Sequence, residues 1–334
     1  MTVMSALDLY WLDSALRLHR RVATATISGF CLLALAGGTF SPDVQSFLLL
    51  SGIITVGFPH GAFDYLVARP VLAQRLGPYW WFYFGTGYFG LAGAVWITWA
   101  VAPAMTLIGF LMASVLHFGL GDIEDDLAPE TVPRAIAIFG YGGLPILMPI
   151  AIHPQACAPL LAALAKVPVS TMVNALAAVS WWMPVWIIAF AWIMLANLRE
   201  HRTIVERLAT VVAMVLLPPV LAFGLYFTIG HSVRHLLRLG AWHEPRDLAV
   251  ATRWLRRVIA PAGVLCALGI TGLVLMAGDI TIDVLTPCFQ VIAVLTLPHM
   301  IVTGWLEHSK VGKLLRPVVP QLFQLPKNAR GLLR

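Results

Sequence analysis

Long apolar segments separated by short polar stretches recur along the whole 334-residue chain. A helix needs about 20 predominantly apolar residues to cross the hydrocarbon core of a bilayer. Eight segments come close to or exceed that length, at residues 22–40, 44–68, 79–102, 103–121, 172–197, 212–238, 258–277 and 284–306. This pattern predicts an all-α, polytopic transmembrane helical bundle.

Two further apolar stretches leave the number of spans open. Residues 134–152 contain three glycines and two prolines, and residues 156–170 are too short to span comfortably. Irregular backbone is tolerated at membrane depth where protein covers it, so a re-entrant piece is one alternative, and we expect about eight to ten spans. The first apolar run follows an extended N-terminus with Asp8 and Asp13 and lacks a small-residue cleavage site, so we expect a retained helix rather than a signal peptide.

Composition and charge agree with a membrane protein. Hydrophobic residues make up 59% of the chain and charged residues only 11%, whereas soluble domains carry about 25% charged residues. The net charge of +6 is explained by basic clusters that favour the cytoplasmic side of a membrane, and no nucleic-acid partner is expected. We therefore expect one integral-membrane domain over residues 1–334 in the cell inner membrane. Residues 1–21 would be its cytoplasmic N-terminus, and residues 307–334 its basic C-terminal tail.

Five of the ten histidines lie inside apolar segments, namely His60, His117, His231, His235 and His299. Ionisable side chains at membrane depth are costly, so they usually face the bundle interior and mark a site or a path. A single such histidine is most often a hydrogen-bonded core residue, but five together favour a site. His231 and His235 are four residues apart, which places them on one face of a helix.

The positions of these histidines within their segments predict that they converge. All except His235 lie roughly 20–28 Å from the start of their helix, at about 1.5 Å per residue. Helices that run in the same direction would bring the rings to one depth, where a bundle core can hold a metal. The basic residues that follow His231 favour the cytoplasmic side. Residues 212–238 would therefore run towards the cytoplasm, as the helices of His60 and His117 do. The C-terminus would also be cytoplasmic, so the number of spans should be even. The basic loop at 199–207 would then face outward, against the same rule.

The side chains available as ligands limit which metals the predicted site could bind. Imidazole suits zinc, copper, nickel and iron, and the four cysteines show no CxxC spacing. Asp64, four residues after His60, could accept a hydrogen bond from a ligating ring and fix its tautomer. For Asp122, five residues after His117, two interpretations stay open: a place in the outer shell of the metal, or, as we favour, a helix end in the headgroup region. Arg234 is expected to extend towards the headgroups. No GxSxG, Walker or GxGxxG motif competes, and the HxxHH box of membrane di-iron enzymes is absent.

Four motifs follow one another along the chain: PHGAFD at residues 59–64, HFGLGD at 117–122, HSVRH at 231–235 and LPHM at 297–300. Together they resemble the Brp/Blh family of carotenoid dioxygenases, membrane enzymes that cleave β-carotene into retinal. The resemblance implies a mononuclear non-haem Fe(2+) with four ligands, His60, His117, His231 and His235. It places His299 near the substrate or in the outer shell of the metal, where Asp64 and Asp122 are also expected.

The activity that the resemblance implies is oxidative cleavage. The central 15,15′ double bond of β-carotene, or of a related carotenoid, would be cleaved with O2 to give two all-trans retinal molecules, and a microbial rhodopsin could receive them. The substrate would enter from the lipid bilayer, and the aromatic runs at 79–90 and 181–186 could line a tunnel or form interfacial belts. Two alternatives stay open: a histidine-lined transporter of metal ions or protons, and a protein that binds carotenoid or retinal without cleaving it.

Overall fold

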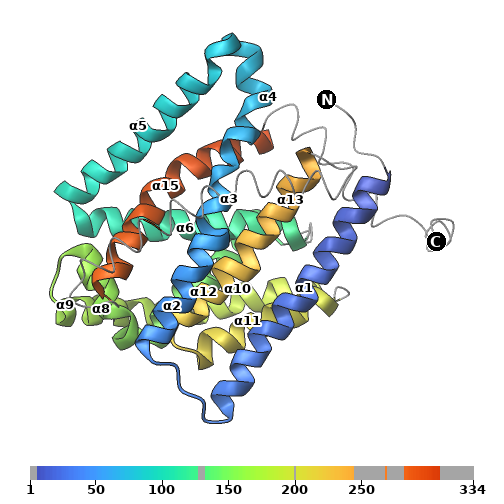
Figure 1. Cartoon of the computed structure of the whole chain (residues 1–334). Coiled ribbons are helices and arrows are strands. Elements are labelled where there is room, and N and C mark those ends of the chain that lie inside the picture. The colour runs from blue at the N-terminus through green and yellow to red at the C-terminus, as the bar shows by residue number, and fades with distance from the viewer. Residues whose placement is uncertain (1–5, 127–131, 199–200, 244–267, 269–281, 309–334) are drawn as a thin grey trace, which may run out of the picture.

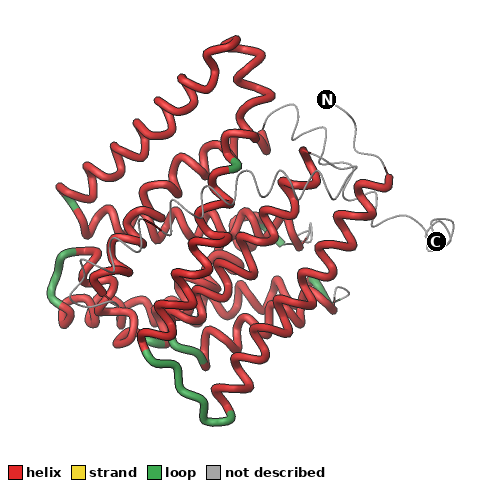
Figure 2. The backbone as a smooth tube through the Cα atoms, in the orientation of Figure 1, coloured by secondary structure: helices red, strands yellow, loops and turns green. Residues whose placement is uncertain are grey.

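The computed structural model describes residues 6–126, 132–198, 201–243, 268 and 282–308 (Figure 1). Within these residues the chain forms helices joined by short turns, with no strand (Figure 2). The all-α expectation is confirmed. Most of the expected span at 258–277, and the basic tail beyond His308, lie outside the described residues.

The described helices have the following bounds. They are α1 (Ala6–Leu35), α2 (Pro42–Gly52), the π-helix η1 (Ile53–Gly57), α3 (Phe58–Ala62), α4 (Asp64–Leu76), the 3-10 turn η2 (Gly77–Tyr79), α5 (Trp80–Val101), α6 (Pro103–Asp126), α7 (Arg134–Ile152), α8 (Pro154–Ala165), α9 (Val169–Val179), the 3-10 turn η3 (Ser180–Trp182), α10 (Met183–Ala196), α11 (His201–Leu216), α12 (Pro219–Leu225), the π-helix η4 (Tyr226–Ser232), α13 (Val233–His243) and α15 (Ile282–His308).

Six described helical segments are long and apolar enough to cross a membrane, namely Pro42–Gly61, Val67–Val101, Pro103–Ile123, Arg134–Ile152, Val169–Ala196 and Ile282–Gly304. Two of the expected spans that lie within the described residues are not among them. The run at 22–40 falls largely within α1, which begins at Ala6, so residues 6–21 are helical where we expected an extended segment. The run at 212–238 is divided at Pro218, between the end of α11 and the start of α12, because proline lacks the N–H that would continue the helix.

The stretch at 134–152, for which we left a re-entrant piece open as one alternative, forms the continuous helix α7 even though Pro145 and Pro149 lie inside it. α7 packs against α6 and α10. A Cβ on Gly142 would overlap the backbone carbonyl of Val115 on α6, so only glycine permits this approach. Small residues let membrane helices pack closely. The glycines that suggested a break therefore form a helix contact.

The arrangement of the helices brings the histidine-bearing segments together. α2, η1 and α3 form one rod that runs beside a second rod of α12, η4 and α13, and α1 packs along α11 and α13 (Figure 1). α5 leans away from the bundle and contacts it through α4, α6 and α15. α15 also contacts α3 and α6, α6 contacts η4, and α13 contacts α3. All five expected histidines therefore belong to segments that touch one another.

Candidate functional site

Five histidine rings form one group inside the bundle, which we call the histidine cluster: His60 on α3, His117 on α6, His231 on η4, His235 on α13 and His299 on α15. The ring centroids of neighbouring members are 4.9–6.3 Å apart. The rings of His231 and His235 are nearly parallel, 7° apart, as two side chains four residues apart on a helix should be. The structure thus assembles side chains that are separated by up to 239 positions in sequence into one site.

Two π-helical segments position part of the cluster. η1 ends at Gly57, three residues before His60, and η4 contains His231. The two segments pack against each other. A Cβ on Gly57 would meet the ring of Phe227 at 2.9 Å, so glycine is needed for this contact. Short π-helical turns occur frequently at functional sites, and here one precedes a cluster residue while the other contains one.

The ring nitrogens of the cluster have few hydrogen-bond partners. His117 Nε2 and His231 Nε2 are 3.2 Å from each other. His60 Nδ1, His235 Nε2 and His299 Nε2 are buried without a hydrogen-bond partner. Buried polar groups are usually paired, so these nitrogens are available to bind a ligand. Among the described residues, however, no three or more His, Cys, Asp or Glu side chains are arranged to hold a metal ion as they stand. The metal site therefore stays a prediction.

Asp64 contacts a different histidine from the one that sequence spacing suggested. We expected Asp64 to lie on the His60 face of its helix. Instead its Oδ1 and Oδ2 atoms lie 2.8 and 2.9 Å from His299 Nδ1. The Tyr88 hydroxyl on α5 donates a second hydrogen bond to it, at 2.9 Å. A turn at Phe63 separates α3 from α4, so the spacing of four residues no longer places Asp64 beneath His60.

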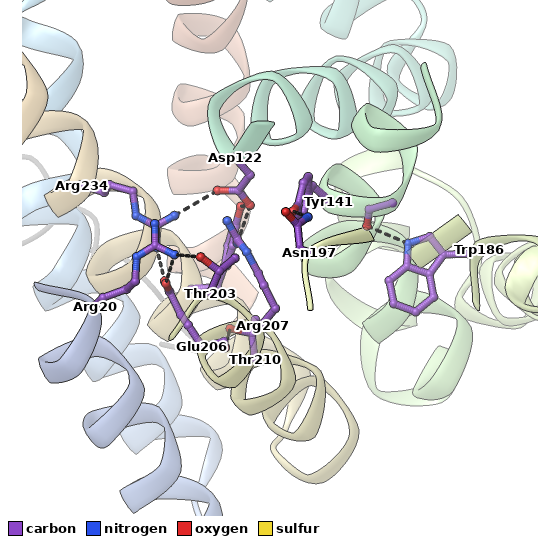
Figure 3. Close-up of polar contacts among 12 residues, drawn as sticks. Arg20, Asp122, Tyr141, Trp186, Asn197, Thr203, Glu206, Arg207, Thr210 and Arg234 are labelled. Atoms are coloured by element: carbon purple, nitrogen blue, oxygen red, sulfur yellow. Dashed lines mark hydrogen bonds and ion pairs between the residues drawn. The ribbon is translucent and has the colours of Figure 1, made fainter. Parts of the chain in front are cut away.

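Asp122 lies in the protein interior rather than in the headgroup region. It is 1% exposed and accepts from Arg207 at 2.8 Å and from the Tyr226 hydroxyl at 2.9 Å (Figure 3). The Tyr226 ring in turn stacks near His231, with ring centroids 6.4 Å apart. The Tyr226 ring therefore lies between Asp122 and the His231 ring of the histidine cluster.

Arg234 is also buried, where we expected it to extend to the headgroups. Its guanidinium pairs with Asp122 at 3.4 Å and with Glu206 of α11 (Figure 3). Arg20 of α1 adds a further contact to Glu206 at 3.5 Å. The two carboxylates balance the buried Arg207 and Arg234, as buried charges require. These ion pairs tie α13, which carries His235, to α6 and α11.

Sequence reasoning missed Glu206 and Arg207, which we had placed in or beside an outward-facing basic loop. Both lie on α11, and both are buried. A signal for this was present, because Thr203, Glu206, Arg207 and Thr210 repeat at helical spacing. These four residues form a buried polar stripe along an otherwise apolar helix.

A cavity of about 960 Å³ borders the histidine cluster, near the upper end of the roughly 300–1,000 Å³ typical of small-molecule pockets. His60, His117 and His299 form part of its wall, whereas His231 and His235 do not. Most of the remaining wall is aromatic: Trp81, Phe82, Phe84, Tyr88 and Phe89 of α5, with Phe58, Phe110, Phe118, Phe223 and Phe227 from other helices. The cavity is therefore an apolar chamber with imidazoles along one side.

The two aromatic runs seen in the sequence have different roles. The run at 79–90 supplies the α5 wall of the cavity, and several of its side chains, including Phe89, are more than half exposed. The run at 181–186 does not reach the cavity. Trp181 and Trp182 are exposed, while Trp186 is buried and donates to the Gly140 carbonyl at 3.1 Å (Figure 3). Only the first run can line a substrate chamber.

Comparison with known proteins identifies relatives of this chain. It is 29% identical over 310 residues to a protein of Halobacterium salinarum named "Probable beta-carotene 15,15′-dioxygenase Blh", with 84% of this chain and 90% of the relative aligned. It is 24% identical over 200 residues to the "Beta-carotene 15,15′-dioxygenase" of uncultured marine bacterium 66A03, with 56% of this chain and 66% of the relative aligned. No solved structure matches the chain.

The sequence profile of the family described as "Beta-carotene 15,15′-dioxygenase" matches residues 51–307. That range contains all five residues of the histidine cluster, the carboxylates Asp64 and Asp122, and the α5 wall of the cavity. The resemblance noted from the four motifs is confirmed. The chain belongs to the β-carotene 15,15′-dioxygenase family.

Proposed function

We propose that this protein is a non-haem iron dioxygenase of the cell inner membrane that cleaves β-carotene at the central 15,15′ double bond with O2, giving two all-trans retinal molecules. The observation that carries the proposal is the juxtaposition of five buried imidazoles with a large aromatic cavity. The family membership and the names of the two relatives support the same activity.

The histidine cluster suits a ferrous ion by its donor chemistry. In this proposal Fe(2+) is held by His60, His117, His231 and His235, which supply neutral imidazole nitrogens of the kind that iron accepts. Two of them, His60 and His235, each have a buried ring nitrogen without a hydrogen-bond partner. Iron bound there would supply the capacity to activate O2.

The cavity would bind and orient the carotenoid. Its aromatic wall offers apolar contact along a polyene, and His60 and His117 reach its surface. A carotenoid held against that side of the cavity would have one double bond fixed near the imidazoles. Fixed placement of reacting groups accelerates a reaction by limiting their motion. The cavity wall would also exclude water from the reacting carbons.

The exposed outer side of α5 supports entry of substrate from the bilayer. Trp81, Phe82 and Phe89 line the cavity and are 55–69% exposed. In a membrane such side chains would contact lipid, so the wall between lipid and cavity is one aromatic layer thick. Retinal could leave by the same route and be taken up by a microbial rhodopsin.

The test is expression in a β-carotene-producing bacterium, followed by extraction and chromatography of retinoids. The parent should form retinal, and His231→Ala should leave β-carotene intact because it removes an iron ligand. His153→Ala is the matched control: His153 lies outside the cluster and bonds the carbonyls of Met214 and Val215, so retinal should still form.

Other products would revise or refute the proposal. Shorter or longer apocarotenals from the parent would contradict cleavage at the central bond. Intact carotene in cells whose membranes contain the folded parent protein would contradict the enzyme proposal. Metal uptake by the same cells would then favour the transporter alternative.

A further inference from the structure

A carboxylate at the cavity wall joins three helices. Asp64 of α4 is 1% exposed. It lies 2.8 Å from Nδ1 of His299 on α15 and accepts from the hydroxyl of Tyr88 on α5 at 2.9 Å. All three side chains line the cavity. The contacts therefore connect an aromatic cavity wall to one ring of the histidine cluster.

The Asp64 contact determines how His299 can use its two nitrogens. A carboxylate only accepts hydrogen bonds, so Nδ1 must carry the proton that it donates to Asp64. The neutral ring then has its lone pair on Nε2. That atom is buried and has no hydrogen-bond partner. The rings of His60, His117 and His235 lie around His299, with centroids 5.0, 5.1 and 5.5 Å away.

A purely structural role explains this arrangement poorly. A buried imidazole that only filled space would be expected to pair both nitrogens, because an unpaired buried polar atom costs free energy. Metal-binding histidines show a different pattern, in which one nitrogen binds the metal and the other donates to a carboxylate or carbonyl. His299 matches that pattern through its contact with the Asp64 carboxylate.

We infer that His299 is a fifth nitrogen ligand of the iron, binding through Nε2, and that Asp64 is the positioning residue that fixes its tautomer and orientation. Tyr88 holds Asp64 in turn. This inference rests on the proposed iron site. It moves His299 from the substrate or outer-shell position that the family resemblance implies into the ligand set, and it assigns Asp64 to His299 rather than to His60.

Iron affinity tests the inference without relying on turnover. The full-length parent and each variant would be purified in detergent, and ferrous iron binding would be measured by competition with a chelator. Asp64→Asn should bind iron about 10–100-fold more weakly, the range found when the supporting contact of a ligand is removed. His299→Gln removes the ligand itself, so it should weaken iron binding more than Asp64→Asn does. Tyr88→Phe should have a smaller effect in the same direction, because Asp64 still contacts His299.

Thr303→Val is the matched control on α15. Thr303 lies one turn after His299 and donates to the His299 backbone carbonyl at 3.0 Å, but it does not line the cavity. Its replacement by a residue of equal shape should leave iron affinity unchanged. If His299→Gln fails to accumulate, the visible spectrum of the cobalt-substituted protein tests whether Asp64 positions a metal ligand. Asp64→Asn should shift the ligand-field bands, and Thr303→Val should not.

The possible outcomes separate this inference from the proposed function. A parent protein that binds no iron overturns both. A parent that binds iron, with unchanged affinity in either Asp64→Asn or His299→Gln, overturns this inference and leaves the proposed function standing. Cobalt spectra that are identical in the parent and Asp64→Asn overturn it as well.

Discussion

Replacing Arg234 by methionine would remove the cation that links the two buried carboxylates. Arg234 is 3% exposed and pairs with both Asp122 and Glu206. Methionine preserves much of the side chain's length and volume, so the change acts mainly on charge. In the parent, the charges of four buried side chains sum to zero: Asp122, Glu206, Arg207 and Arg234. Without the Arg234 cation, the other three would carry a net charge of −1.

The expected cost follows from what each carboxylate retains. Asp122 keeps Arg207 at 2.8 Å and the Tyr226 hydroxyl at 2.9 Å. After Arg234 is lost, Glu206 keeps the 3.5 Å ion pair between its Oε2 and Arg20, and that oxygen accepts no hydrogen bond from the described residues. Breaking a buried pair from one side typically costs about 3–5 kcal/mol. Because Asp122 stays paired, we expect the lower end, about 3 kcal/mol.

Reversible unfolding in mixed SDS and detergent micelles would measure this loss. Arg75→Met is the control, because Arg75 is exposed on α4 and its replacement should change the free energy of unfolding by less than about 0.5 kcal/mol. Arg234→Met combined with Glu206→Gln should recover roughly half of the loss, because it removes the unpaired charge. An Arg234→Met protein as stable as the parent, or a double variant less stable than the single one, would refute this account of the network.

Two further substitutions test the helix packing and the cavity. Gly142→Ala should destabilise the protein by about 1–3 kcal/mol, because the new Cβ overlaps the Val115 carbonyl. Its control is Gly109→Ala on α6, where a Cβ would have no atom within 4 Å. In the same SDS titration, Gly109→Ala should not lower the unfolding midpoint. Phe84→Ala should raise KM for β-carotene about tenfold, from ~1.5 kcal/mol of lost apolar contact in the cavity, with a smaller change in kcat. Trp182→Ala, an exposed aromatic outside the cavity, is its control in steady-state assays, and equal KM values in the two variants would contradict the assigned cavity.

The membrane class and the residues of the histidine cluster could be predicted from the sequence. Both depend on local properties: long apolar runs are easily recognised, and a histidine inside such a run is costly unless it faces a site. The structure places the His299 ring beside those of His60 and His117. The depth argument predicted this convergence, because it used only helix length and direction.

The partners of the charged residues could not be predicted, because they depend on contacts between distant segments. The predicted contact of Asp64 with the His60 face assumed one unbroken helix. The turn at Phe63 ends α3 before Asp64, so Asp64 does not lie beneath His60. The Asp122 and Arg234 predictions assumed a bilayer surface nearby, whereas α11 supplies Glu206 and Arg207 from more than 80 residues beyond Asp122. The break at Pro218 was missed, and the continuity of residues 134–152 was left open, because tertiary packing decides whether a proline interrupts a helix.

The most direct test of the central claim is the reaction of the purified protein, loaded with ferrous iron, with β-carotene and O2 in detergent. The account predicts two molecules of all-trans retinal for each β-carotene consumed, with no retinal after the iron is removed by a chelator and restored activity when iron is added back. Retinal formation that continues at the same rate in the iron-free protein, or a product other than retinal from the iron-loaded protein, would contradict it.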